Sequence, residues 1–297
     1  MHIGIAGTGR MGTNIGERLI ELGHKLTVWN RSPGKLKPLL DAGAAPATTP
    51  AELASAVECV ITILTDAPAI DAVYLGPQGL LAGDVKGKLF IEMSTVPPEV
   101  SVALEPKVRA KGAGFVECPV GGSTQPARQG KLLGLIGGEP ADVARARPII
   151  DQMCRRALHG GPVGSGAILK FTVNLPLMIY WQALGEALAM CNALTVDPKE
   201  LLDFLTETSG AANVLKIRQV PVVAKMKGEP PAPATFDVNG GIKDIKAMLA
   251  EGERRGLDLP VLKKTLECYE EAKRNWGGEG EISAGVAVYW ANRNKKK

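Results

Sequence analysis

The sequence predicts two domains: an α/β domain built on a mostly parallel, doubly wound sheet, then an all-α domain that a long helix joins to it. Two observations predict the first domain. Short apolar runs alternate with helical patterns over about the first 140 residues, and a glycine-rich turn follows the first run. A third predicts the second domain, because residues 167–273 carry long helical patterns and essentially no strand alternation.

Six short apolar runs are expected to form the strands, because their length and β-branched content suit buried strands. They are HIGIA (2–6), KLTVW (25–29), CVITIL (59–64), KLFIEM (88–93), GFVE (114–117) and LLGLI (132–136). Helical patterns lie between them, such as MGTNIGERLIELG (11–23) and PPEVSVALEPKVRAKG (97–112). This alternation predicts helices on both faces of a parallel sheet.

The glycine-rich stretch HGGPVGSG (159–166) is the expected joint between the domains. We place the α/β domain at 1–164 and the helical domain at 165–297. The helical patterns of the second domain are LPLMIYWQALGEALAMCNAL (175–194), DIKAMLAEGERRG (244–256) and VLKKTLECYEEAKRN (261–275). KGEPPAPATF (227–236) is expected to be a proline-rich loop.

Composition excludes several classes of protein. The chain has 297 residues, 45% of them hydrophobic, and a net charge of only +4. Five scattered cysteines without a CxxC pair indicate neither disulfides nor a zinc knuckle, and three dispersed histidines indicate no metal site. The basic tail NRNKKK (292–297) lacks aromatic residues for nucleic-acid binding. Without a basic leader or an uncharged apolar run of membrane length, we expect a cytoplasmic protein with no membrane partner.

The first chemical motif follows the first expected strand. Its six residues, in the pattern G-x-G-x-x-G, are Gly7, Thr8, Gly9, Arg10, Met11 and Gly12. Strand, turn and helix in this order are typical of a Rossmann dinucleotide site, where the glycines allow a tight turn, close approach of the pyrophosphate and close helix packing. The motif predicts a dinucleotide with its phosphates at the helix N-terminus.

The end of the second strand indicates which dinucleotide binds. An NAD enzyme would place Asp or Glu here against the ribose 2'-hydroxyl, but this chain has Asn30, Arg31 and Ser32. An arginine and a hydroxyl can hold a 2'-phosphate, and no carboxylate is present to repel it. NADP (as NADPH) is therefore favoured over NAD, although Arg31 is also consistent with an ordinary exposed loop residue.

Taken together, the motifs resemble the β-hydroxyacid dehydrogenase family, which includes 3-hydroxyisobutyrate dehydrogenases, tartronate semialdehyde reductases and plant-type glyoxylate reductases. The similarity covers nearly the whole chain. Its five motifs, in order, are GIAGTGRMG (4–12), MSTVPPE (93–99), ECPVGGSTQPARQGKLLGLIGG (117–138), GAILKFTVN (166–174) and GIKDIKAMLA (241–250).

The resemblance implies that Lys170 is the catalytic acid in carbonyl reduction and the base in alcohol oxidation. An ammonium group can stabilise the alkoxide that forms when hydride reaches a carbonyl, and can give it a proton. Asn174 is catalytic with it and can orient the substrate, because residues four apart share one face of a helix. Without the resemblance, the sequence pattern favours a solvated lysine on a helix face at Lys170.

The resemblance also assigns residues to the cofactor. Ser94 and Thr95 are expected at the nicotinamide end, and Leu64 and Thr65 along the cofactor through backbone contacts. Lys243 is expected to close over cofactor and substrate. Its neighbour Asp244 is expected to fix the local structure.

The chain departs from the family in its substrate-binding segment. Where the family typically reads Asp-Ala-Pro-Val-Ser-Gly-Gly, this chain reads Glu-Cys-Pro-Val-Gly-Gly-Ser over 117–123, so Gly121 replaces the serine that holds the substrate carboxylate. The backbone N–H groups of Gly121, Gly122 and Ser123 can still bind an anion. Leu175 and Pro176 follow Asn174 where glutamine is common, and Pro176 predicts a local kink. Tyr180 and Trp181 either adapt the pocket to a larger carbonyl or simply pack the helix.

Three functions follow from these residues. The first is an NADP-dependent oxidoreductase of the 3-hydroxyisobutyrate dehydrogenase type, acting on a small aldehyde or keto acid. The alternatives are an NADPH-dependent imine reductase and a non-catalytic NADP-binding scaffold. A homodimer or homotetramer is expected, since a helical domain with a long apolar helix generally needs a partner surface.

Overall fold

The computed structural model describes residues 1–231 and 233–293, which divide between two compact units, Met1–Phe171 and Thr172–Lys297. Of the basic tail 292–297, only Asn292 and Arg293 lie inside the described residues. Within the described residues no helix is both long and apolar enough to cross a membrane.

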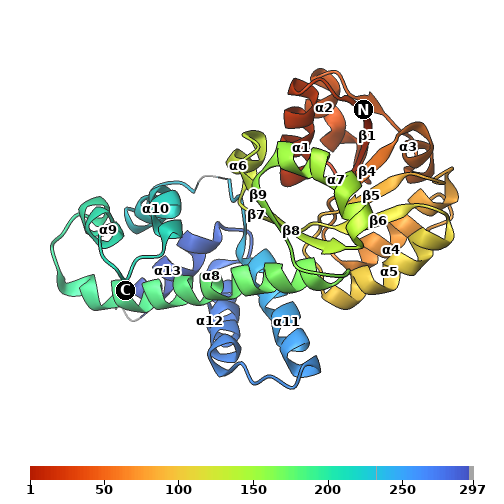
Figure 1. Ribbon diagram of the computed structural model, residues 1–297. Helices are drawn as coiled ribbons and strands as arrows, with labels where there is room; N and C mark the ends of the chain where they lie inside the picture. The colour runs from red at the N-terminus through yellow and green to blue at the C-terminus, as the bar shows by residue number, and fades with distance from the viewer. Residues whose placement is uncertain (232, 294–297) are drawn as a thin grey trace. The chain divides into compact units, whose positions relative to one another are not determined.

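The first unit contains a single sheet with the strand order β3-β2-β1-β4-β5-β6-β8-β7, and β9 pairs with β8 (Figure 1). The strands from β1 to β6 pair in parallel, β8 runs antiparallel to β6 and β7, and β9 runs parallel to β8. Their bounds are β1 His2–Ala6, β2 Lys25–Trp29, β3 Ala45–Pro46, β4 Cys59–Thr62, β5 Leu89–Glu92, β6 Gly114–Glu117, β7 Val120–Gly121, β8 Leu132–Gly138 and β9 Cys154–His159.

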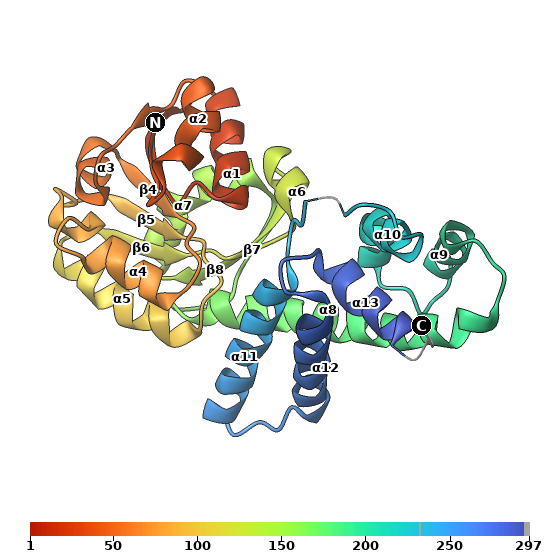
Figure 2. The ribbon, with the colours of Figure 1, turned by 180° about the vertical axis from the view of Figure 1, so that it is seen from behind.

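Helices cover both faces of this sheet (Figure 2). They are α1 Arg10–Glu21, α2 Lys37–Asp41, α3 Pro50–Ala56, α4 Ala67–Leu75, α5 Pro98–Ala110, α6 Thr124–Arg128 and α7 Pro140–Met153. Successive strand residues point to opposite faces, so Ile61 of β4 packs with Ile15 of α1 in one core. Its neighbour Val60 packs with Leu53 of α3 in the other. The predicted doubly wound α/β domain is confirmed.

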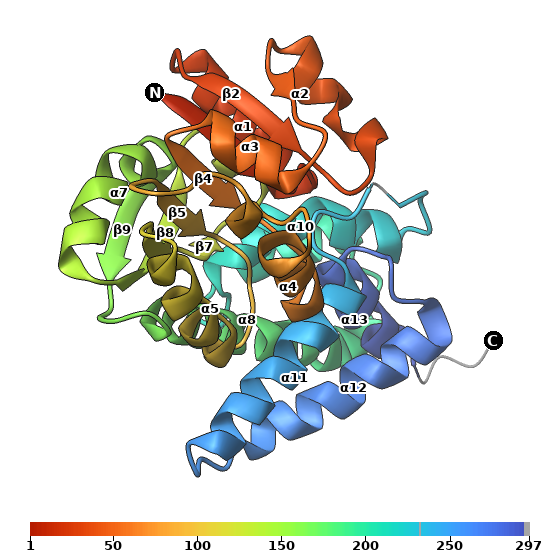
Figure 3. The same ribbon diagram turned by 90° about the vertical axis from the view of Figure 1, so that its right-hand side faces the viewer.

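The second unit is helical, as predicted. Its helices are α8 Ser165–Met190, which begins in the first unit, α9 Pro198–Thr206, α10 Asn213–Met226, α11 Val238–Arg254, α12 Pro260–Trp276 and α13 Ile282–Asn292. The short 3-10 helix Cys191–Ala193 follows α8, which continues through Pro176 without a break. Helices α11 and α12 pack side by side (Figure 3). Trp181 is only 1% exposed, so it packs in the core of this unit.

Candidate active site

The carboxyl ends of β1 and β2 hold the glycine-rich turn. The Gly7 N–H donates to the Trp29 carbonyl at 2.9 Å, and the Thr8 N–H donates to Asn30 Oδ1 at 3.2 Å. The Thr8 hydroxyl donates to the Lys35 carbonyl at 3.1 Å. These bonds join the turn to the loop after β2, so two of the predicted cofactor segments lie together.

Two glycines of the turn are required by packing and one is not. A Cβ built at Gly7, where φ is +104°, would lie 2.2 Å from the Ile63 carbonyl oxygen, and one at Gly12 would lie 2.0 Å from the Gly7 carbonyl oxygen. A Cβ at Gly9 would meet nothing within 4 Å. Gly9 therefore faces open space at the N-terminus of α1, whose first turn holds no acidic residue. This open backbone fits a pyrophosphate.

The other predicted cofactor residues around the turn differ in how exposed they are. Arg10 and Arg31 are exposed, whereas the half-buried Met11 packs its side chain against the core, so only its backbone is left for a cofactor. Ser32 is exposed, and its carbonyl accepts from Asn30 Nδ2 at 3.0 Å. Asn30 thus holds both the turn and the loop that carries Arg31.

A buried carboxylate that the sequence analysis missed organises the loop after β5. Glu92, at the end of β5, is 1% exposed, and its Oε1 accepts from the Ser94 N–H at 2.7 Å. The Thr62 hydroxyl donates to its other oxygen. Burial raises the pKa of Glu92, against the opposing effect of the hydrogen bonds from Ser94 and Thr62. Its one signal in the sequence is a charged residue inside an apolar strand run.

Ser94 links two predicted cofactor segments. Its Oγ accepts from the Leu64 N–H at 2.8 Å, and its own N–H is held by Glu92. Thr65, which follows Leu64, is exposed, and Thr95, which follows Ser94, is half-buried. The loops after β4 and β5 are therefore joined by one hydroxyl at the carboxyl edge of the sheet, where doubly wound folds bind their ligands.

The segment predicted to bind the substrate runs through β7 into α6. Gly121 is buried in β7 and pairs with Leu133, Gly122 has φ of +120°, and Ser123 is the residue before α6. A Cβ at Gly121 would lie 3.4 Å from the Leu133 Cβ, an ordinary contact. The packing therefore leaves room for a β-carbon at Gly121.

The catalytic candidates lie on α8, which carries Lys170 and Asn174 four residues apart and buries both, at 9% and 5% exposed. In the second unit, Asn174 Nδ2 donates to Asp244 Oδ2 at 3.2 Å. The Lys243 Nζ lies 3.3 Å from Asp244 Oδ1, and the Lys243 side chain is 43% exposed. Asp244 is thus the buried carboxylate that fixes the Asn174 carboxamide.

Comparison with known proteins identifies the family. Residues 2–161 match the NAD-binding domain of 6-phosphogluconate dehydrogenase, and residues 164–289 match the NAD-binding domain of NADP-dependent 3-hydroxyisobutyrate dehydrogenase. Glyoxylate/succinic semialdehyde reductase 1 of Arabidopsis thaliana is 32% identical over 96% of each chain. The chain belongs to the β-hydroxyacid dehydrogenase family. It is therefore an NAD(P)-dependent oxidoreductase of a family that acts on CH–OH groups.

Other members of the β-hydroxyacid dehydrogenase family extend the comparison. The 3-hydroxyisobutyrate dehydrogenase of Pseudomonas aeruginosa is 31% identical, over 87% of this chain and 88% of its own. A solved 3-hydroxyisobutyrate dehydrogenase structure from Salmonella typhimurium shares the fold with a TM-score of 0.86, at 20% identity over 97% of this chain and 99% of that one. The resemblance predicted from the five motifs is thus confirmed.

Proposed function

We propose that the protein is an NADPH-dependent reductase of small carboxylated aldehydes or keto acids, in which Lys170 is the general acid. The observation that carries the proposal is a buried lysine on α8, one helical turn from a buried asparagine. The name of the Arabidopsis relative, a glyoxylate and succinic semialdehyde reductase, supports the substrate class.

The chemistry required of the protein is charge stabilisation and proton transfer. NADPH, when bound, supplies the hydride. Lys170 stabilises the negative charge that develops on the substrate oxygen and donates a proton to it from Nζ, and in the oxidative direction neutral Lys170 accepts that proton. The Asn174 carboxamide orients the same oxygen. Since Asp244 already accepts one Asn174 N–H, the second N–H and Oδ1 are left for the substrate.

The substrate carboxylate would bind the backbone of the segment after β6. Gly121 pairs with Leu133, so its N–H faces β8 in the antiparallel ladder. The N–H groups of Gly122 and Ser123 follow at the turn from β7 into α6, and successive N–H groups at such a turn form anion-binding nests. The positive φ of Gly122 supports this interpretation. The missing serine hydroxyl predicts weaker carboxylate binding than a serine-containing site would give.

The proposal specifies NADPH rather than NADH because of the loop after β2. Arg31 and Ser32 are both exposed there, and Asn30 ties the loop to the phosphate-binding turn. A guanidinium beside a hydroxyl suits a 2'-phosphate, and the loop lacks the carboxylate that would bind the 2'-hydroxyl of NAD.

The proposal includes self-association through the second unit. Large apolar side chains are exposed on its helices, with Met190 87%, Val220 78% and Phe204 68% exposed. Exposed apolar surface of this kind commonly marks protein interfaces. Light scattering of Phe204→Glu and Val220→Glu against the unchanged protein tests it; a monomeric unchanged protein would contradict it.

The substrate is tested by following NADPH oxidation with glyoxylate, succinic semialdehyde, tartronate semialdehyde, an uncharged aldehyde and a cyclic imine. We expect turnover of the carboxylated aldehydes. Turnover of the imine alone would instead support an imine reductase. NADPH binding without turnover of any compound would leave only a cofactor-binding scaffold.

A further inference from the structure

The helix that carries Lys170 begins on a buried carboxylate. Glu117, the last residue of β6, has an Oε1 that accepts from the Gly164 N–H at 2.6 Å and from the Gly166 N–H at 2.7 Å. Glu117 is 1% exposed. The first turn of α8 is therefore attached to the sheet by one side chain.

The backbone around this carboxylate is closely packed. A Cβ built at Gly137 of β8 would lie 2.3 Å from Glu117 Oε1 and 2.9 Å from the Gly166 nitrogen. A Cβ at Gly166 would lie 2.5 Å from the Leu135 carbonyl oxygen. The start of α8 thus rests on the backbone of β8 with no side chain between them. Gly164 approaches this position with φ of +100°, which favours glycine.

The electrostatics explain why an acidic group is tolerated here. Burial raises the pKa of Glu117, and the hydrogen bonds from Gly166, Gly164 and Ala167 act in the opposite direction. These N–H groups belong to the start of α8, where a helix has unpaired donors and a positive dipole end. The helix start and the carboxylate satisfy each other.

We propose that Glu117 is a positioning residue for the reduction, because it fixes the helix start from which Lys170 projects. This inference rests on the proposed role of Lys170. Lys170 follows Gly166 by one helical turn, so a shift of the helix start moves its ammonium group by a similar distance. Misplacement by about 1 Å can cost about 10²-fold in rate. Glu117 also begins the substrate-binding segment, so it ties that segment to the catalytic helix.

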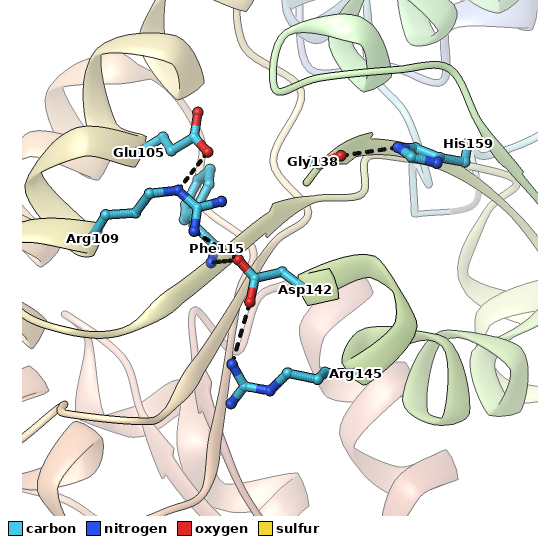
Figure 4. A network of polar contacts seen from close by, with 7 residues as sticks. All are labelled: Glu105, Arg109, Phe115, Gly138, Asp142, Arg145 and His159. Atoms are coloured by element: carbon cyan, nitrogen blue, oxygen red, sulfur yellow. Dashed lines mark hydrogen bonds and ion pairs between the residues drawn. The ribbon is translucent and has the colours of Figure 1, made fainter. Parts of the chain in front are cut away.

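The test compares Glu117→Ala with Asp142→Ala. Asp142 is also a buried carboxylate of the first unit, but it binds Arg109, Arg145 and the Phe115 N–H between α5, α7 and β6 (Figure 4). Turnover is measured with NADPH and succinic semialdehyde, well below each variant's melting temperature. Hydrogen exchange of the Gly164 and Gly166 amides is measured in the protein without cofactor.

We expect Glu117→Ala to lower kcat by about tenfold or more with the KM for NADPH changed less than about twofold. The two amides should exchange at least about tenfold faster, because their acceptor is gone. Asp142→Ala should lose stability and keep both kcat and the slow amide exchange. Equal kcat values for the two variants, or unchanged amide exchange in Glu117→Ala, would overturn the inference.

Two further variants keep the test decisive if Glu117→Ala does not fold. Glu117→Gln keeps the reach and an oxygen that can accept from both amides, whereas Glu117→Asp keeps the charge but is one methylene shorter. Positioning predicts a nearly normal kcat for Gln and a low one for Asp; the reverse order would refute it. Lys170→Ala is run in parallel. Normal turnover there would reject the proposed function, whereas a loss there with no loss in the Glu117 variants rejects only the positioning role.

Discussion

The glycine-rich turn between β1 and α1 makes a sharp prediction because its glycines face different surroundings. At Gly9, which has φ of −74°, an added Cβ would meet nothing within 4 Å. Gly9→Ala should therefore fold normally, with a stability change of at most about 1 kcal/mol, because the reduced freedom of the unfolded chain is offset by replacing a favoured N-cap glycine of α1. At Gly12 the same Cβ would lie 2.0 Å from the Gly7 carbonyl oxygen, a backbone atom that cannot move aside. Gly12→Ala should cost about 1–3 kcal/mol or more.

NADPH affinity gives a second test of Gly9→Ala. If the pyrophosphate lies against the open face of Gly9, the added methyl group of Gly9→Ala occupies its place. NADPH affinity should then fall by about tenfold or more, which is about 1.4 kcal/mol. Urea unfolding measures the stability and isothermal titration calorimetry the affinity. Unchanged NADPH affinity in a fully folded Gly9→Ala would refute the placement of the phosphates at this turn.

Three further changes test other parts of the site. Arg31→Ala should raise the KM for NADPH by about tenfold or more and leave that for NADH unchanged, because only NADPH carries the 2'-phosphate; equal changes in steady-state kinetics would contradict the NADPH assignment. Burial raises the pKa of Glu92, so the Glu92 carboxyl group binds its proton more tightly in the folded protein than in the unfolded chain. The stability of the folded protein therefore falls as the pH rises through the raised pKa. The free energy of unfolding of the unchanged protein, relative to that of Glu92→Gln, should therefore decrease with rising pH by at most about 1.4 kcal/mol per pH unit. Urea unfolding at a series of pH values measures this difference, and an increase with pH would contradict the prediction. Gly121→Ser should fold, since its Cβ has room, and should lower the KM for glyoxylate by about threefold to tenfold, the usual worth of one added hydrogen bond; a raised KM would argue against carboxylate binding at this segment.

The fold could be predicted because its signals are local. Runs such as CVITIL and KLFIEM became β4 and β5, although Leu64 and Met93 had already left the sheet. The strands β3 and β7 have two residues each, too few for a periodic pattern. The strand β9 escaped prediction because its exposed Arg155 and Arg156 replace the apolar alternation of a typical strand.

The site could be predicted only where a motif is contiguous. The motif from Gly7 to Gly12 could be recognised from consecutive residues, without knowledge of the fold. Glu117 was expected to matter only as a departure from the family pattern, because its partners Gly164 and Gly166 lie 47 and 49 residues further along the chain. Likewise, Asn174 and Asp244 meet across 70 residues. Contacts of this range depend on the sheet order and helix packing, which the sequence pattern does not specify.

The central claim is that Lys170 is the general acid, and the most direct measurement is kcat for Lys170→Ala at saturating NADPH, with NADPH affinity measured in parallel. Lys246→Ala is the matched control, since Lys246 is an exposed lysine paired with Glu270 at 2.8 Å. The proposal predicts a loss of about 10²-fold or more in kcat for Lys170→Ala, with NADPH affinity nearly unchanged and normal turnover in Lys246→Ala. Equal turnover in the two variants would contradict it and leave Lys170 as a structural residue of α8.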